Sequence, residues 1–297
     1  MSPIERDVCI LDGDGTAGIV VAGDSRAKYS LIPSILAEEM GRKCINIAEP
    51  ITMGGDISTL VKVLRRNPQV LANHPILILS VNLESLNDLG YTGTPVATLW
   101  DWSPLDHFRV FLHQPRTYLK YFVREFLPSI KTLTMHKWKG ELFHCSEGIY
   151  QPPGLLTYQG YEPLQGRKDE KELYRWPSDE QRYLLNGGRW KAYEAALEWL
   201  SQSPAQSVIV YSAPMDTAWV RQAAGPALLN VPARFSKILA EEAVRYPKIT
   251  FVDLYPDGVP GLVPELHYHD FVHLNQAGAE IFSHYMGKKL AGKIPNP

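Results

Sequence analysis

Strand-like and helix-like segments alternate along most of this sequence, and no other feature constrains the fold as strongly. Short apolar runs rich in β-branched residues are followed by segments whose apolar residues have helical spacing. The strand-like runs lie at 17–25, 44–50, 74–82, 206–214 and 249–256. Alternation with short connections predicts an α/β fold: a three-layer α/β/α sandwich whose flavodoxin-like parallel sheet is covered by helices on both faces.

The alternation breaks after the third strand-like run. Residues 84–186 are rich in tryptophan and tyrosine and do not continue the pattern. We therefore expect a single domain over 1–297, with an insertion at 84–186. The aromatic side chains of the insertion fit either ordinary packing onto the core or a lid or substrate-recognition wall over the functional edge of the sheet.

Charge and composition exclude several classes of partner. The formal net charge is −2 and no Lys/Arg run occurs, so electrostatic binding of nucleic acid is not expected. No apolar stretch is long enough to span a membrane, and the N-terminus lacks the apolar core of a signal peptide. We expect a cytoplasmic location by default, or an extracytoplasmic one if a leader is missing from the sequence given.

Ser25, Asp270 and His273 are expected at one edge of the predicted sheet, where parallel strands end and ligands bind. Gly-Asp-Ser at 23–25 ends the first strand, and Asp270 lies three residues before His273, ahead of the last helix. A serine hydroxyl becomes a nucleophile when an imidazole accepts its proton, and a carboxylate on the other ring nitrogen orients that imidazole. Each residue alone also fits a helix cap or a surface position, so only the combination indicates a catalytic triad.

Four short blocks, GDS, GGDIS, SVN and DFVHLN, occur in this order along the chain. They resemble the ordered blocks of the GDSL/SGNH hydrolase superfamily, which contains serine esterases and acetylhydrolases. The resemblance covers nearly the whole chain apart from the insertion. It implies that Ser25 is the nucleophile, His273 the general base and Asp270 the residue that orients this base.

The same resemblance implies an oxyanion hole. Its donors would be the backbone N–H groups of Ser25 and Gly55 and the side chain of Asn82, with Gly54 as an alternative to Gly55. Such donors stabilise the negative charge that develops on the carbonyl oxygen in the tetrahedral intermediate.

The sequence departs from the usual pattern of this superfamily in two respects. The superfamily commonly has Gly-x-Asn-Asp around the asparagine, where this sequence has Ser80 and Leu83 on either side of Asn82, and Arg26 stands where a leucine commonly follows the nucleophile. Arg26 fits either a solvated helix residue or a substrate-binding cation that favours anionic or sugar-rich substrates.

The function that we expect is that of a serine esterase, which hydrolyses an oxygen ester through an acyl-Ser25 intermediate without a metal or an organic cofactor. Its substrate would be a small molecule or a glycan that carries a short acyl group such as acetyl. Two alternatives keep the same fold: an O-acyltransferase of glycan modification that uses the same triad, and a non-catalytic binding module.

Two other motifs suggest different chemistry. The stretch 9–18 resembles the first motif of the haloacid-dehalogenase-like phosphatases, which implies Asp12 as nucleophile, Asp14 as acid/base and a bound Mg²⁺. Asp-Gly pairs of this kind also form hairpin turns. His267 and His269, together with His273, have a spacing that could ligate zinc, but we expect the first two to be surface or supporting residues.

Overall fold

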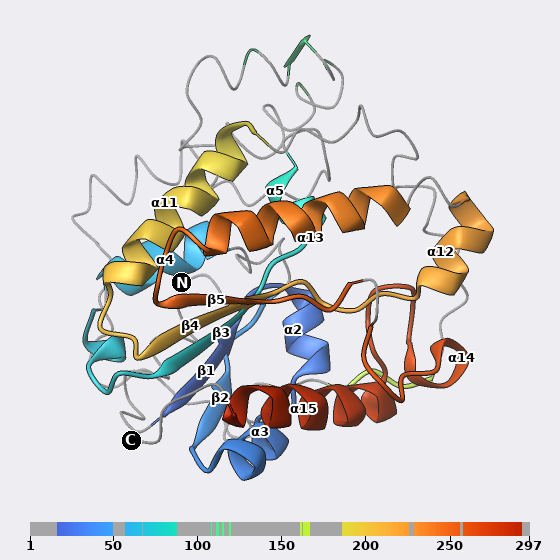
Figure 1. Cartoon of the computed structure of the whole chain (residues 1–297), viewed down its shortest axis with the longest axis horizontal. Coiled ribbons are helices and arrows are strands. Elements are labelled where there is room, and N and C mark those ends of the chain that lie inside the picture. The colour runs from blue at the N-terminus through green and yellow to red at the C-terminus, as the bar shows by residue number, and fades with distance from the viewer. Residues whose placement is uncertain are drawn as a thin grey trace.

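The computed structural model describes residues 17–49, 57–66, 68–87, 161, 163–166, 186–225, 229–255 and 258–292, with isolated positions at 108, 111, 112, 115 and 119. A five-stranded sheet of order β2-β1-β3-β4-β5 forms its centre, and every pair of neighbouring strands is parallel (Figure 1). The strands are β1 (Ile19–Ala22), β2 (Cys44–Asn46), β3 (Ile76–Ser80), β4 (Ser207–Tyr211) and β5 (Ile249–Val252). This order confirms the expected flavodoxin-like sheet.

Helices cover both faces of the sheet, as Figure 1 shows. On one face lie α4 (Ile57–Arg66), α11 (Gly188–Gln202) and α13 (Asn230–Ala243). On the other lie α2 (Ser25–Ser30), α3 (Pro33–Met40) and α15 (Gln276–Ala291). The shorter elements are η2 (Pro68–Leu71), α5 (Leu83–Leu86), α12 (Thr217–Ala224) and α14 (Pro264–His267). The expected three-layer α/β/α sandwich is therefore confirmed.

The pleat of the central strands explains the two cores. Leu77 and Leu79 of β3 pack into the core under α4, α11 and α13, whereas Ile76 and Ile78 pack into the core under α3 and α15. Alternate residues of a strand point to opposite faces of the sheet, so a strand covered on both faces must be apolar throughout. All five residues of β3 are buried.

Helix α15 is joined to the break between α2 and α3. The Ser283 hydroxyl of α15 accepts a hydrogen bond from the backbone N–H of Ile32 at 2.8 Å and donates to the carbonyl of Ser30 at 3.3 Å. Proline at the first position of α3 suits a helix start, because that position needs no N–H donor. These bonds fix the helix that begins with Ser25 against the helix that follows His273.

Several predicted features lie outside the described residues. They include most of the insertion at 84–186, Asp12 and Asp14 of the phosphatase-like motif, and Gly54 and Gly55 of the predicted oxyanion hole.

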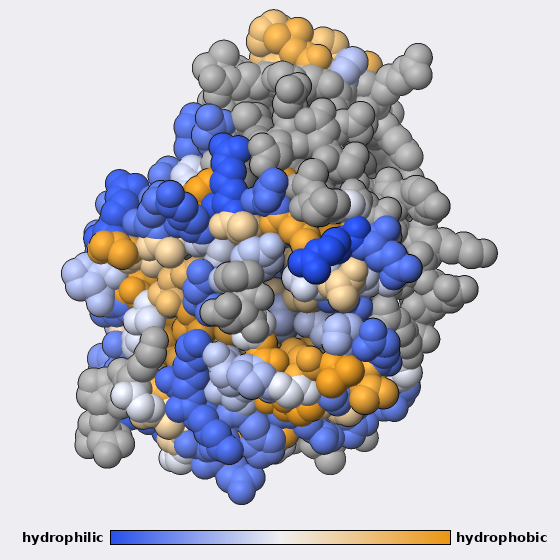
Figure 2. Space-filling view, turned by 45° about the vertical axis from the view of Figure 1, so that its right-hand side comes forward, coloured by the Kyte–Doolittle hydropathy of each residue, from blue (hydrophilic) through white to orange (hydrophobic). Residues whose placement is uncertain are grey.

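Four large apolar side chains in the insertion are exposed, namely Phe108, Phe111, Leu112 and Leu119. Figure 2 shows a group of hydrophobic residues, coloured orange, at the upper end of the view. The single domain and the role of the insertion as a lid or wall stay predictions.

A search of the described helices finds none with the length and apolar character needed to cross a membrane.

Candidate active site

A sharp turn after β1 places Ser25 at the start of α2. Gly23 has a φ of 121°, which glycine adopts readily and other residues rarely do. Asp24 is the N-cap of α2, and its Oδ1 accepts the backbone N–H of Arg26 at 3.0 Å. The chain therefore leaves a buried strand, bends within one residue and begins a helix with the serine in its first turn.

Gly23→Ala is expected to lower the free energy of unfolding by about 3 kcal/mol. A Cβ at this position would lie 2.5 Å from the Ser80 carbonyl oxygen, in addition to the strain of the positive φ. Urea unfolding measures the effect, and Gly41→Ala is the matched control, because Gly41 also has a positive φ but open space around it. Equal losses in the two variants would contradict the prediction.

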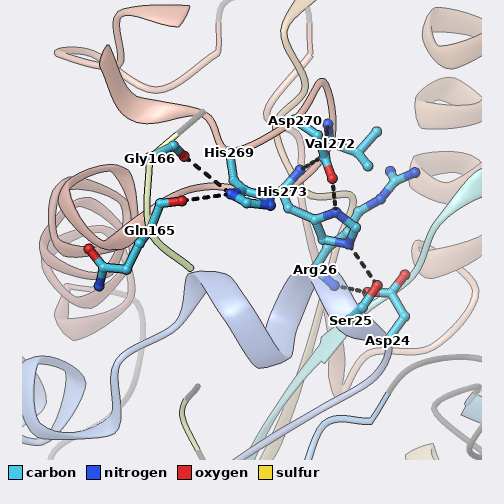
Figure 3. Close-up of polar contacts among 9 residues, drawn as sticks. All are labelled: Asp24, Ser25, Arg26, Gln165, Gly166, His269, Asp270, Val272 and His273. Atoms are coloured by element: carbon cyan, nitrogen blue, oxygen red, sulfur yellow. Dashed lines mark hydrogen bonds and ion pairs between the residues drawn. The ribbon is translucent and has the colours of Figure 1, made fainter. Parts of the chain in front are cut away.

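Ser25, His273 and Asp270 form a continuous chain of hydrogen bonds (Figure 3). The Ser25 Oγ lies 2.9 Å from His273 Nε2, and His273 Nδ1 lies 2.7 Å from Asp270 Oδ2. A carboxylate accepts hydrogen bonds, so Nδ1 carries the proton and Nε2 is the acceptor for the serine hydroxyl. The His273 and Asp270 side chains are 21% and 22% exposed, so this hydrogen-bonded series of side chains is only partly buried and stays accessible to solvent.

The Asp270 carboxylate organises its own loop as well as the imidazole. Its Oδ1 accepts the backbone N–H groups of Val272 at 2.9 Å and His273 at 2.8 Å, while Oδ2 accepts the imidazole. The backbone N–H of His269 donates to the carbonyl of His273, and that of Asp216 donates to the carbonyl of Phe271. The His273 loop is therefore held by the imidazole ring, by its own backbone bonds and by the neighbouring β4–α12 loop.

The pKa of Asp270 is lowered from its ordinary value of 3.8 to about 2. Burial alone would raise this pKa, but the hydrogen bond and the charge of His273 lower it, as do the backbone N–H groups of Val272 and His273. The carboxylate therefore stays ionised beside the imidazole over the whole neutral range.

Tyr29 is a neighbour of His273 that the sequence analysis did not single out. Its ring meets the imidazole edge-on, with ring centroids 5.5 Å apart and an angle of 78° between the planes. Tyr29 lies four residues after Ser25 on α2, and residues at that spacing share one face of a helix. This spacing is the one signal in the sequence that could have identified it.

Asn82 follows β3 and is buried. Its Oδ1 accepts the backbone N–H of Ser85 at 2.8 Å and so caps α5. Because the cap uses the oxygen, the Nδ2 amino group is the end of the side chain that remains for donation to a substrate. The place of Asn82 in an oxyanion hole with Ser25 and Gly55 stays a prediction.

Arg26 is only 3% exposed, so its interpretation as a solvated helix residue is wrong. Helix α2 contacts β1, β3 and α15, and Arg26 is among its buried residues. A role for Arg26 in substrate binding stays a prediction.

His267 and His269 bind backbone atoms rather than a shared centre. His267 Nδ1 accepts the N–H of Val263 at 2.8 Å, and His269 Nδ1 lies 3.0 and 3.1 Å from the carbonyl oxygens of Gln165 and Gly166 (Figure 3). In the described parts of the chain, no group of three or more His, Cys, Asp or Glu side chains could hold a metal ion. His269 thus joins residues 165–166 to the loop of the imidazole.

Comparisons with known proteins give little further information. No model of a known protein family matches this sequence, and no curated protein matches it. Among solved structures, the chain is similar to one from Streptococcus pneumonia described as "a putative platelet activating factor". The two are 11% identical, the match covers 97% of this chain and 91% of the other, and the TM-score is 0.49.

Proposed function

We propose that this protein is a serine hydrolase that cleaves an oxygen ester through an acyl-Ser25 intermediate. The observation that carries the proposal is the hydrogen-bonded chain from Ser25 Oγ through His273 to Asp270, at 2.9 and 2.7 Å. Side chains 248 residues apart in the sequence meet in the geometry that an activated serine requires. The ordered blocks that resemble the GDSL/SGNH hydrolases name the same three residues.

The first half of the proposed reaction acylates the serine. As Ser25 Oγ attacks the carbonyl carbon of the ester, His273 Nε2 takes the hydroxyl proton, and Asp270 stabilises the resulting imidazolium. The former carbonyl oxygen becomes negative, and the Asn82 amide with the N–H of Ser25 would donate to it. Collapse of this intermediate expels the alcohol, which receives the proton from His273.

The second half regenerates the enzyme. His273 takes a proton from water, the resulting hydroxide attacks the acyl carbon, and Ser25 leaves with the proton returned by the imidazole. We propose a short acyl group such as acetyl, carried by a small molecule or a carbohydrate, on the basis of the same resemblance. If a sugar hydroxyl replaces water in this step, the identical residues transfer the acyl group instead of hydrolysing it.

Reaction with a fluorophosphonate tests the proposal directly. Ser25 Oγ is expected to bond to phosphorus with loss of fluoride, giving one adduct by intact-mass analysis and a modified peptide that contains Ser25. Ser25→Ala should take up no probe, whereas Ser201→Ala on α11 should react like the wild type, because that hydroxyl donates to the Glu198 carbonyl of its own helix. A folded wild type without an adduct, or an adduct on another serine, would overturn the proposal.

A further inference from the structure

The backbone pairing between β1 and β3 ends just before the nucleophile turn. The last paired residues are Ala22 and Leu79, and the next residues, Gly23 and Ser80, lie in close contact. Beyond that point a side chain connects the two strands: the Ser80 hydroxyl donates to Asp24 Oδ1 at 3.0 Å. The Ser80 side chain therefore continues the contact between β1 and β3 beyond the last backbone pair, Ala22 and Leu79.

The acceptor of this bond also determines where α2 begins. The same Asp24 Oδ1 caps the N–H of Arg26, and the Asp24 carbonyl accepts from Ala27 and Lys28 at 3.1 Å each. Asp24 is 1% exposed, and among the described atoms its other carboxylate oxygen, Oδ2, has no hydrogen-bond partner. A buried carboxylate depends on each donor it has, so the Ser80 hydroxyl is a large part of what holds Asp24 in place.

Tyr211 of the neighbouring strand β4 lies beside Ser80. It pairs with Ser80 in the register of β3 and β4 and is fully buried. Burial raises the pKa of Tyr211 most, and the nearby charge of Asp24 raises it further, while the Tyr211 hydroxyl has no hydrogen-bond partner among the described atoms. Ser80 is therefore enclosed between Asp24 and Tyr211, with little freedom to turn its hydroxyl elsewhere.

We propose that Ser80 is a positioning residue that acts through Asp24 to hold the Ser25 hydroxyl at the correct position relative to the Asn82 side chain. Ser80 lies two residues before Asn82 on the chain and binds the residue before Ser25, so it links the nucleophile to the donor expected at the oxyanion. Displacements of about 1 Å at such sites can lower rates roughly 100-fold. The inference rests on the proposed function, because it needs Ser25 to be the nucleophile.

Ser80→Ala is expected to lower both kcat for a short-chain ester and the rate of fluorophosphonate labelling about 10-fold to 100-fold, with KM changed less than about 3-fold. The matched control is Ser236→Ala, which also removes a bond from a buried serine hydroxyl to a carboxylate, here that of the exposed Asp253 beside the edge strand β5. Rates are normalised to the folded fraction measured by circular dichroism. A purely structural bond would affect stability in both variants and leave both labelling rates at the wild-type value.

A double-mutant cycle tests whether Ser80 acts through Asp24. Asp24→Ser keeps a residue that caps helices well but removes the carboxylate that Ser80 binds. In this background Ser80→Ala should cause no further loss of rate. An undiminished loss there, or a wild-type rate for Ser80→Ala alone, overturns this inference and leaves the proposed function standing. A wild type that does not react with the probe overturns both.

Discussion

Ester hydrolysis is expected to fall by the same large factor, on the order of 10⁶ in kcat, when Ser25 or His273 is replaced by alanine, and to fall no further when both are replaced. The reason is that the two residues act as one unit: the hydroxyl is a poor nucleophile without the imidazole, and the imidazole has no proton to take without the hydroxyl. The 2.9 Å contact between Oγ and Nε2 is the physical basis of this dependence.

Hydrolysis of a chromogenic acetyl ester measures the effect in the two single variants and the double variant. His284→Ala is the matched control, because His284 Nδ1 lies 2.7 Å from Glu39 Oε1, the same distance as between His273 and Asp270, but no serine completes a triad in the described structure. We expect this variant to keep wild-type activity. Losses that multiply in the double variant would show that Ser25 and His273 act independently and would contradict the prediction.

Asp270→Asn is expected to lower kcat by about 10⁴ while leaving KM nearly unchanged. An asparagine can present its amide nitrogen to His273, and the imidazole then carries its proton on Nε2, where it cannot accept the proton of Ser25. The 2.7 Å contact with Oδ2 is the one that this substitution alters. The acetyl-ester assay measures kcat and KM, and activity within 10-fold of the wild type would contradict the role of Asp270 as the orienting carboxylate.

The same variant should also show a pH-dependent loss of stability. The pKa of Asp270 is about 2 in the folded protein, below its ordinary value of 3.8, so the carboxylate stabilises the fold above that ordinary value. This contribution amounts to about 2 kcal/mol at pH 7 and is lost as the pH falls through 2. Urea unfolding of wild type and Asp270→Asn should differ at pH 7 and converge toward pH 2, whereas a constant difference would contradict this origin.

The sequence was sufficient to predict the sheet and the meeting of the three principal side chains. Parallel strands end at one edge, so residues that follow β1 and precede α15 had to approach one another there once the alternation was recognised. Ser25 begins α2, Asp270 and His273 lie in the loop just before α15, and their positions follow from these well-patterned elements.

The contacts of Tyr29, Ser80 and His269 could not be predicted in the same way. Each depends on a neighbour far away in the sequence: the ring of His273, the carboxylate of Asp24, and the carbonyls of residues 165–166. The periodicity of apolar residues predicts which face of a helix or strand is buried, but it does not predict which side chain from elsewhere in the fold packs against that face. Of the two interpretations of Arg26, the solvated one fails for this reason: a charged residue in a helix is usually solvated, but Arg26 is buried.

Ser25 and His273 are 248 positions apart in the sequence, so they are synthesised at different times. During synthesis at about 5–20 residues per second, Ser25 is made roughly 10–50 s before His273, which the proposed function assigns as its general base. Throughout that interval the serine is an ordinary alcohol. In the proposed function, reactivity toward esters therefore arises only once α15 packs beside α2 and α3, after nearly all of this sequence has been made.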